Sequence, residues 1–262
     1  MSYEHMTMDV SDGVALLRIN RPDSANAIHL PLTEELVDAA IRCDEDPAIR
    51  AVVLTGEGKM FCAGGDIGFF VSQGEDRLPS VVKKMLLNLH GAISRLHRMD
   101  PPVVCAVNGT AAGAGFSLAL QGDLVLAAES AKFTMAYTRV GLSPDGSSSY
   151  FLPRRVGSKR ALDLILTNRL LTAAEALDWG IVDYLHPDDK LMDEAMKLAA
   201  TLANGPTRAF GTAKRLIHES STDSLESQME RETVGIVECM RTPDGKEGMD
   251  AFVNKRPAKF GG

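Results

Sequence analysis

The sequence is short of the residues that mark several specialised classes of protein. Its four cysteines, at positions 43, 62, 105 and 239, lie far apart and form no CxxC pair, so we expect reduced thiols and no disulfide framework. The six histidines form no HxH or HExxH pair, which predicts that no metal is bound. No apolar run approaches the roughly 18 residues that a bilayer span needs, and no signal peptide is recognisable. We therefore expect a cytoplasmic protein without a membrane segment.

Positive charge is also scarce. The chain has 28 Lys and Arg residues against 35 Asp and Glu residues, which gives a net charge of −7. A surface that wraps nucleic acid needs an excess of basic residues, so we expect no nucleic-acid partner. With 262 residues, 45% of them hydrophobic, the chain is long enough to bury a substantial core. These values describe an ordinary globular protein, and its function has to be sought in local motifs.

Short, β-branched apolar runs that end in turn residues predict strands in the first half of the chain. The segments "MTMDV" and "VALLRI" around "SDG" predict a hairpin in which Gly13 takes a positive φ. Further strands are predicted at 51–56, 102–109 and 122–129. Helical spacing predicts helices in "TEELVDAAIRCDED", with Thr33 as N-cap, and over 80–99.

From about residue 160 the pattern becomes almost wholly helical, with Gly, Asn and Pro as breakers between the helices. The chain has no long linker, low-complexity segment or sequence repeat. We therefore predict an α/β protein in two parts. A strand-and-helix core would occupy 1–195, and a helical region over 196–262 would pack against other subunits.

Two glycine-containing loops each follow a predicted strand and open a helix. In "CAGGDI" the small residues 63–65 precede Asp66, and in "NGTAAGAGF" residues 113–115 begin a helical stretch. Small residues at such places let a ligand approach the backbone N–H groups of a helix start. Two loops of this kind predict a pair of donors that converge on one oxygen atom.

Other interpretations of these loops fail on spacing. The second loop reads GxxxGxG and not GxGxxG, so a dinucleotide fingerprint is unsupported. Neither loop matches GxxxxGK[ST], which removes the phosphate-binding P-loop. Ser117 stands in "AGFSLA" and not in a GxSxG elbow, which argues against a serine hydrolase.

One carboxylate, Asp145, stands alone in "GLSPDGSSS". Pro-Asp-Gly is a common turn sequence, because proline presets φ and Asp bonds its own downstream backbone. On this stretch alone Asp145 is either a turn residue or a working acid.

Six segments match a known family in the same order along nearly the whole chain: "INRPDSANAI", "MFCAGGDI", "AVNGTAAGAGFSLALQGDLVLAAESAKFTMAY", "GLSPDGSSSYFLPRRVG", "LTAAEALDWGIVDYL" and "AFVNKRPAKF". The chain thereby resembles the crotonase superfamily of enoyl-CoA hydratases and isomerases. The resemblance implies a ββα spiral core, a helical trimerisation region and an acyl-CoA thioester substrate. It also implies a homotrimer or a dimer of trimers, with no cofactor beyond the coenzyme A of the substrate.

The resemblance assigns roles to single positions. The backbone N–H groups of Gly65 and Ala114 match those that hold the thioester oxygen as it becomes an enolate. Related hydratases carry two glutamates where this chain has Ser117 and Tyr137. Neither residue supplies a carboxylate base, which places ordinary hydration in doubt. Asp145 matches the aspartate of related isomerases that shift a double bond, so its catalytic interpretation is now favoured over the turn.

The aromatic-CoA dehalogenase of the family supplies the alternative chemistry. It is similar to this chain at His90 and Asp145, and it has a hydrogen-bonding tryptophan where Tyr137 stands. There Asp145 would be the nucleophile and His90 would activate water. A hydratase and a non-catalytic acyl-CoA-binding oligomer remain as further alternatives, and a packed or half-exposed histidine remains the plain interpretation of His90. Residues that match the family's coenzyme A contacts are Ala25, Ala27, Ala63, Asp66, Ile67, Phe252 and Lys255.

Overall fold

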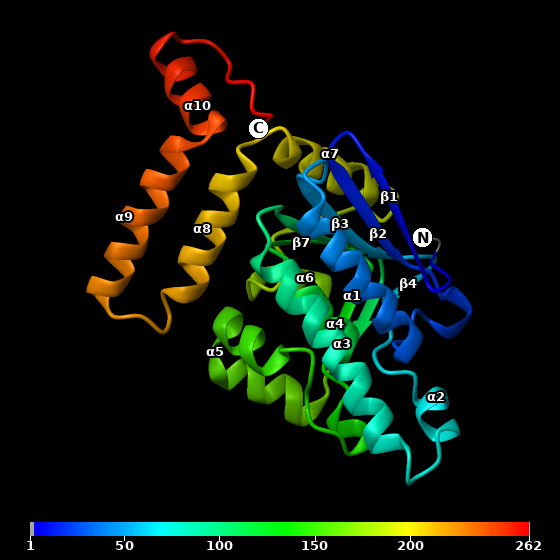
Figure 1. Ribbon diagram of the computed structural model, residues 1–262. Helices are drawn as coiled ribbons and strands as arrows, with labels where there is room; N and C mark the ends of the chain where they lie inside the picture. Colours follow the sequence, from blue (N-terminus) through cyan, green and yellow to red (C-terminus); the bar gives the residue numbers. More distant parts are fainter. Residues whose placement is uncertain (1–2, 262) are drawn as a thin grey trace.

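The chain folds into two sheets that share a set of covering helices, as the computed structural model shows for residues 3–261 (Figure 1). The larger sheet has the order β1-β2-β3-β5-β7-β10, and the smaller has the order β4-β6-β8-β9. The strands of the larger sheet are β1 Met6–Ser11, β2 Val14–Ile19, β3 Ala51–Gly56, β5 Val103–Val107, β7 Leu124–Ala128 and β10 Tyr184–His186. Those of the smaller sheet are β4 Met60–Cys62, β6 Thr110–Ala112, β8 Lys132–Thr134 and β9 Leu171–Thr172.

From β3 to β8, successive strands alternate between the two sheets. The pairs β3-β4, β5-β6 and β7-β8 each place one strand in the larger sheet and the next in the smaller, and helices follow each pair. Within the larger sheet β2, β3, β5, β7 and β10 run parallel, and only β1 is antiparallel to its neighbour. The predicted ββα spiral is therefore confirmed, as is the amino-terminal hairpin.

The described part of the chain contains ten α-helices and two 3₁₀ helices. The helices are α1 Leu30–Glu45, α2 Ile67–Ser72, α3 Leu78–Arg98, α4 Ala114–Leu120, α5 Ser148–Thr167, α6 Ala173–Asp178, α7 Leu191–Ala203, α8 Thr207–Glu219, α9 Leu225–Arg241 and α10 Pro243–Val253, with the 3₁₀ turns Pro22–Ser24 and Thr138–Val140.

Two local predictions need correction. Thr33 is not an N-cap, because α1 begins at Leu30 and the Nδ1 atom of His29 accepts the Leu32 N–H at 3.4 Å. A proline at the second helical position starts the helix earlier than the hydrophobic spacing indicates. The region after 160, predicted as almost wholly helical, also contains two short strands: β9 pairs with β8, and β10 lies parallel to β7. The two-part division stays a prediction; its boundary at 195 falls inside α7, which packs on the larger sheet.

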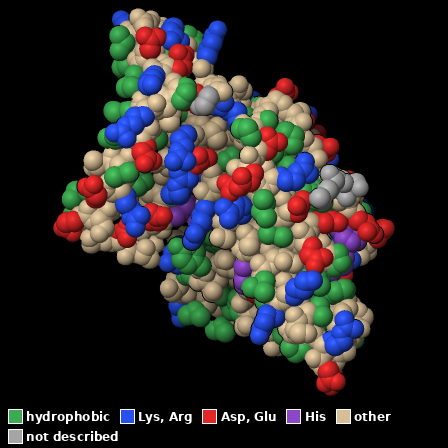
Figure 2. Space-filling model, in the orientation of Figure 1, with side chains coloured by type: hydrophobic (Ala, Val, Ile, Leu, Met, Phe, Trp, Pro, Cys, Tyr) green, Lys and Arg blue, Asp and Glu red, His purple; other side chains and the backbone are tan. Residues whose placement is uncertain are grey.

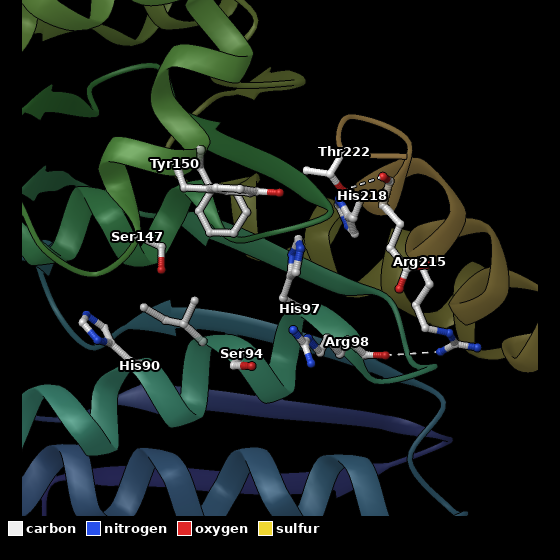
Figure 3. Close-up of a pocket in the computed structure, with 12 residues that line it drawn as sticks. His90, Ser94, His97, Arg98, Ser147, Tyr150, Arg215, His218 and Thr222 are labelled. Atoms are coloured by element: carbon white, nitrogen blue, oxygen red, sulfur yellow. Dashed lines mark hydrogen bonds between the residues drawn. The ribbon is translucent and has the colours of Figure 1, made fainter. Parts of the chain in front are cut away.

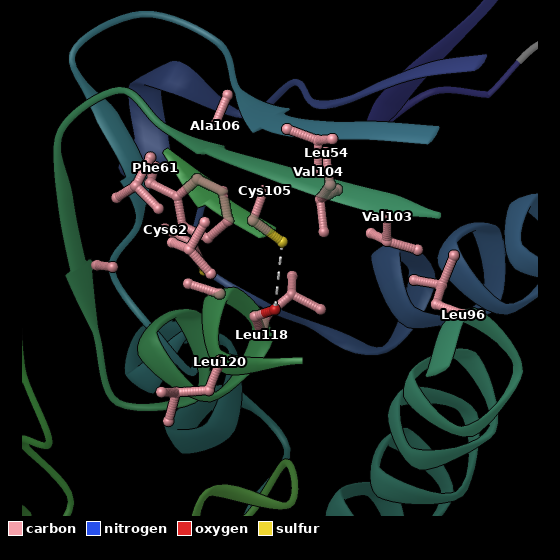
Figure 4. Packing of buried hydrophobic residues seen from close by; sticks show 14 of the residues in the cluster. Leu54, Phe61, Cys62, Leu96, Val103, Val104, Cys105, Ala106, Leu118 and Leu120 are labelled. Atoms are coloured by element: carbon pink, nitrogen blue, oxygen red, sulfur yellow. Dashed lines mark hydrogen bonds between the residues drawn. The ribbon is translucent and has the colours of Figure 1, made fainter. Parts of the chain in front are cut away.

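The core lies between the larger sheet and the helices that cover it (Figure 4). Every residue of β3 and β5 is buried, which fits parallel strands that are covered on both faces. The thiol of Cys105 lies among these side chains and donates to the Leu118 carbonyl at 3.9 Å. Burial raises the pKa of this thiol to about 12. Cys105 therefore stays protonated at neutral pH and acts as a small apolar residue.

The carboxy-terminal helices leave the core as an arm. Helices α9 and α10 extend away from the sheets, and α8 lies between them and the rest of the chain (Figure 1). A buried ion pair fixes α8: the Lys214 ammonium lies 2.7 Å from the Asp123 carboxylate, and their side chains are only 9% and 14% exposed. Lys214 also donates to the carbonyls of Leu96 and Pro101. Lys214 thus ties α8 to the core, together with Arg208 and Arg215, which pair with Asp100 at 3.0 Å and 2.6 Å.

We predict that Lys214→Met lowers the free energy of unfolding by about 3 kcal/mol, because it leaves the Asp123 carboxylate buried without its partner. Lys197→Met is the matched control, since Lys197 pairs with Glu194 on the surface at 3.4 Å and its side chain is 75% exposed. Its effect should stay below about 1 kcal/mol. Urea unfolding of both variants measures the difference, and equal midpoints for both would contradict the role assigned to the buried pair.

Candidate active site

The two glycine loops meet at one cavity of about 410 Å³. Gly65, Ala114, Tyr137 and Asp145 all line it, although they are far apart in the sequence. Most of the remaining wall is apolar: Ile28, Ala63, Ile67, Phe70, Leu78, Pro79, Val82, Met85, Ala136, Val140 and Leu142. The cavity thus combines an apolar surface with a few converging polar groups, which is the usual form of a small-molecule site.

The first loop needs glycine to bring its backbone to the cavity. Gly64 has a φ of +95°, and a Cβ at this position would lie 2.8 Å from the Ala112 carbonyl oxygen of the second loop. The loop is held from its other side by a parallel bridge, in which the Ile28 N–H donates to the Gly64 carbonyl and the Asp66 N–H donates to the Ile28 carbonyl. These contacts place the Gly65 N–H at the cavity wall.

The second loop needs glycine for a different reason. A Cβ at Gly115 would collide with the Cys62 carbonyl oxygen, so only glycine lets α4 begin this close to β4. Helix α4 then starts at Ala114, at the end of β6. The first N–H groups of a helix have no partner within the helix.

The N–H groups of Gly65 and Ala114 have no protein acceptor among the backbone hydrogen bonds of residues 3–261. Ala114 lines the cavity and is only 5% exposed, so its N–H is shielded from bulk water. Two unpaired donors beside one cavity are the arrangement that stabilises a negative oxygen during a reaction. This arrangement supports the predicted oxyanion hole, which stays a prediction.

Asp145 stands in a short hydrogen-bonded network. The Tyr137 hydroxyl donates to its Oδ1 atom at 2.6 Å and lies 2.8 Å from the Ser117 hydroxyl. Burial raises the pKa of the Asp145 carboxyl, while the Tyr137 hydrogen bond and the nearby His90 oppose that rise. Burial and the Asp145 charge raise the pKa of the Tyr137 phenol. Tyr137 therefore keeps its proton and serves Asp145 as a donor.

His90 approaches Asp145 from the opposite side of the loop. Its Nε2 atom accepts the Gly146 N–H at 3.3 Å, and it lines a second cavity of about 340 Å³ together with His97, Ser147 and Tyr150 (Figure 3). His90 is absent from the lining of the 410 Å³ cavity. His90 thus contacts the backbone of the residue that follows Asp145, and its role as a base stays a prediction.

The residues predicted to hold coenzyme A fall into two groups. Ala25 and Ala63 are joined, because the Ala63 N–H donates to the Ala25 carbonyl at 3.0 Å. Arg21 links Ala27 to Asp66, since it donates to the Ala27 carbonyl and pairs with the Asp66 carboxylate at 3.0 Å. Asp66 also caps α2 through the Phe69 N–H. Burial acts to raise the pKa of Asp66, but these two partners hold it below its ordinary value.

The second group does not reach this place within one chain. Phe252 lies at the end of α10 on the arm and is 86% exposed, and Lys255 follows that helix. Neither lines the cavity. Ile67, in contrast, lines the cavity, with 46% of its surface exposed. Its contact with coenzyme A stays a prediction.

Sequence reasoning missed the residues that hold the loops in place. Asn26 is fully buried and donates to the carbonyls of Glu57 and Met60, while its oxygen accepts the Arg21 N–H. The segment "RPDSAN" belongs to a motif of the family, but no single-sequence signal separates a structural asparagine from a turn residue. Within residues 3–261, no group of three or more His, Cys, Asp or Glu side chains is placed so that it could hold a metal ion.

Comparisons with known proteins agree with this geometry. A family model described as enoyl-CoA hydratase/isomerase matches residues 9–262. The chain is 37% identical to the 1,2-epoxyphenylacetyl-CoA isomerase of Escherichia coli, over 99% of both chains. It is 35% identical to a 4-chlorobenzoyl coenzyme A dehalogenase of Arthrobacter, over 97% of this chain and 92% of the other. The crystal structure of an enoyl-CoA hydratase from Polaromonas superposes with a TM-score of 0.92 and 33% identity, over 98% and 99% of the two chains.

The spiral of paired strands, with a cavity at its two glycine loops, defines an enzyme of the crotonase superfamily. Within that class, the chain belongs to the enoyl-CoA hydratase/isomerase family.

Ala114→Pro tests the predicted oxyanion hole. Proline is tolerated at the first position of a helix but removes the N–H, so the fold should survive while turnover falls about 100- to 1000-fold. Ala114→Gly retains the N–H and should lose far less. The turnover of a panel of enoyl-CoA substrates is measured for the parent protein and both variants, provided that their thermal stabilities are equal. Near-normal activity of a folded Ala114→Pro variant would show that this donor is not used.

Proposed function

We propose that the enzyme shifts a double bond in an enoyl-CoA thioester through an enolate, with Asp145 as the base. The observation that carries this proposal is that Asp145 is the only carboxylate among the described residues that line the 410 Å³ cavity. The cavity also holds two unpaired N–H groups, which suit the enolate oxygen. One base and one oxyanion hole are sufficient for a proton shuttle between two carbons.

In the proposed reaction Asp145 removes a proton from the acyl group, and the electron pair moves into the thioester carbonyl. The enolate oxygen then accepts from the N–H groups of Gly65 and Ala114. Asp145 returns the proton to a carbon farther along, and the double bond moves. Because burial raises the pKa of Asp145, the carboxylate is a stronger base than an exposed aspartate, and its acid returns the proton without help.

Hydration is less well supported. The positions where related hydratases carry glutamates hold Ser117 and Tyr137, and these two hydroxyls lie 2.8 Å apart in contact with each other. Ser117 is fully buried, the Tyr137 hydroxyl donates to Asp145, and neither side chain carries a carboxylate to activate a water molecule. A single remaining carboxylate does not supply the pair of groups that adding water to the double bond would use.

Halide displacement is the second candidate. The Tyr137 hydrogen bond to Asp145 Oδ1 favours it, because a donor on one oxygen fixes the other toward the acyl group. Against it, His90 lies outside the cavity lining and uses Nε2 to accept the Gly146 N–H. The similarity to a 4-chlorobenzoyl coenzyme A dehalogenase makes that substrate class part of the test. We expect no cofactor apart from the coenzyme A of the substrate.

We also propose that the arm joins subunits into a trimer or a dimer of trimers in the cytoplasm. Hydrophobic side chains lie exposed along α9 and α10, among charged ones (Figure 2). They are Leu225, Met229, Val234, Ile236, Val237, Met240, Met249, Phe252 and Val253. Such a surface is typical of a subunit interface. In such an assembly, Phe252 and Lys255 of one subunit would reach the cavity of another subunit. No helix of residues 3–261 has the length and apolarity needed to cross a bilayer.

Asp145→Asn tests the base. Asparagine keeps the size and most hydrogen bonds of the turn, so folding and coenzyme A binding should survive. Turnover should fall about 100- to 10,000-fold, because the amide takes up no proton at neutral pH. A panel of enoyl-CoA and 4-chlorobenzoyl-CoA thioesters, followed for double-bond migration and halide release, separates the two candidates. A fully active Asp145→Asn variant would show that Asp145 is a turn residue and not the base.

The activity should also depend on pH with a definite sign. Asp145 works in its deprotonated form, and its pKa is raised by burial. The value of kcat/KM should therefore fall as the pH drops through a midpoint above the ordinary aspartate pKa of about 3.9. A pH profile measured where the protein stays folded gives that midpoint, and a midpoint at or below the ordinary value would contradict the buried base.

The proposed assembly is tested by light scattering and by one charged substitution. Ile236→Glu places a carboxylate on α9 at a residue that is 58% exposed, so it should weaken the oligomer without unfolding the chain. Leu87→Glu on α3, at a residue 70% exposed, is the matched control. The parent protein should have the mass of three or six chains. A stable monomer at micromolar concentration would rule the assembly out.

A further inference from the structure

The Ser117 hydroxyl lies between two acceptors that cannot both receive its proton. Its Oγ atom is 2.8 Å from the Tyr137 hydroxyl and 3.2 Å from the Gly113 carbonyl oxygen. A serine hydroxyl has a single proton to donate. Ser117 is fully buried, so no bulk water takes the place of either partner. The hydroxyl therefore has two orientations, and its surroundings decide between them.

With Asp145 ionised, the orientation is fixed. A carboxylate only accepts hydrogen bonds, so the single proton of Tyr137 points at Oδ1 over 2.6 Å. The Tyr137 oxygen is then left as an acceptor, and Ser117 donates to it. Each hydrogen bond in such a series polarises the next, so the hydrogen bonds from Ser117 through Tyr137 to the carboxylate strengthen one another.

Proton transfer to Asp145 removes the reason for that orientation. A neutral carboxyl group is a much weaker acceptor, so the Tyr137 bond weakens and its oxygen attracts the Ser117 proton less. At the same moment the negative charge appears on the thioester oxygen beside the Ala114 N–H. The Gly113 carbonyl and the Ala114 N–H belong to one resonance-coupled peptide group. Charge at one end of that group makes the other end a better acceptor.

We propose that Ser117 is a positioning residue whose hydroxyl turns from Tyr137 to the Gly113 carbonyl as the negative charge moves from Asp145 to the thioester oxygen. The turn breaks no covalent bond, and the only proton that changes owner is the one that Asp145 takes from the substrate. A hydrogen bond to the Gly113 carbonyl polarises the peptide and strengthens the Ala114 N–H as a donor. This inference rests on the proposed function, in which Asp145 is the base and Ala114 supplies one oxyanion donor.

Acetoacetyl-CoA is a suitable probe, because its bound enolate carries charge on the thioester oxygen and absorbs in the near ultraviolet. The ratio of enolate to keto form is measured for the bound ligand in the parent protein, Asp145→Asn, Ser117→Ala and the double variant. Removing the Asp145 charge should raise the ratio in both backgrounds. With Ser117 present the rise should be larger by about three- to tenfold, the effect of one additional hydrogen bond.

Ser148→Ala is the matched control. Ser148 is also fully buried and donates to the Asp145 backbone carbonyl at 2.9 Å, but it lies outside the chain from Asp145 to Gly113. The rise caused by Asp145→Asn should be the same with and without the Ser148 hydroxyl. If Ser117→Ala does not fold, Ser117→Cys retains the shape with a weaker donor and should show a reduced coupling.

Equal rises with and without the Ser117 hydroxyl would overturn the inference, even if Asp145→Asn and Ala114→Pro abolish turnover as the proposed function requires. Absence of bound enolate in every variant would overturn the oxyanion hole and this inference together. The two failures are thereby distinguishable.

Discussion

The close approach of the two glycine loops is the constraint on which the active site depends. Gly64 faces the Ala112 carbonyl and Gly115 faces Cys62, and neither contact leaves room for a Cβ. Because the backbones meet here, two N–H groups from separate turns of the spiral line one cavity. The larger sheet supports both loops, since β3 and β5 are neighbours in it and lead into β4 and β6. The contacts that pack the two loops together are therefore also the contacts that hold these N–H groups in position.

Few charged groups line the cavity. Asp145 is the single carboxylate among the described residues of the cavity, and a tyrosine in place of a second carboxylate supplies its hydrogen bond. A neutral donor steadies the carboxylate without the repulsion that a second negative charge would add. In the proposed reaction one negative charge moves from Asp145 to the thioester oxygen, so no new charge is created.

Sequence patterns predicted the strands β1, β2, β3, β5 and β7 of the larger sheet, the long helices and the family, because each depends on local periodicity or on motifs that are contiguous in the chain. They missed the smaller sheet, whose strands of two or three residues are too short to show a period. They failed at the start of α1, where a histidine side chain and a proline outweigh the apolar spacing, and at β10, whose three residues pair only through the tertiary fold. Asp145 and Tyr137 were predicted as site residues and both line the cavity, but the contact of Tyr137 with Ser117 joins residues 20 positions apart, which no local pattern indicates. Arg21 and Asn26 were not singled out, since a residue that fixes a loop through buried hydrogen bonds has the same local signature as a turn residue.

The distribution of cysteines has a practical consequence for measuring motion. Cys43, Cys62 and Cys105 are buried, and burial raises the pKa of each to about 12, so they react poorly with thiol reagents. Cys239 is the remaining thiol, and it lies partly exposed on α9. The natural chain therefore accepts a single fluorescent or spin label on its arm without any cysteine being removed. Such a label would follow the arm relative to Trp179, the only tryptophan in the sequence, and would report subunit exchange by energy transfer.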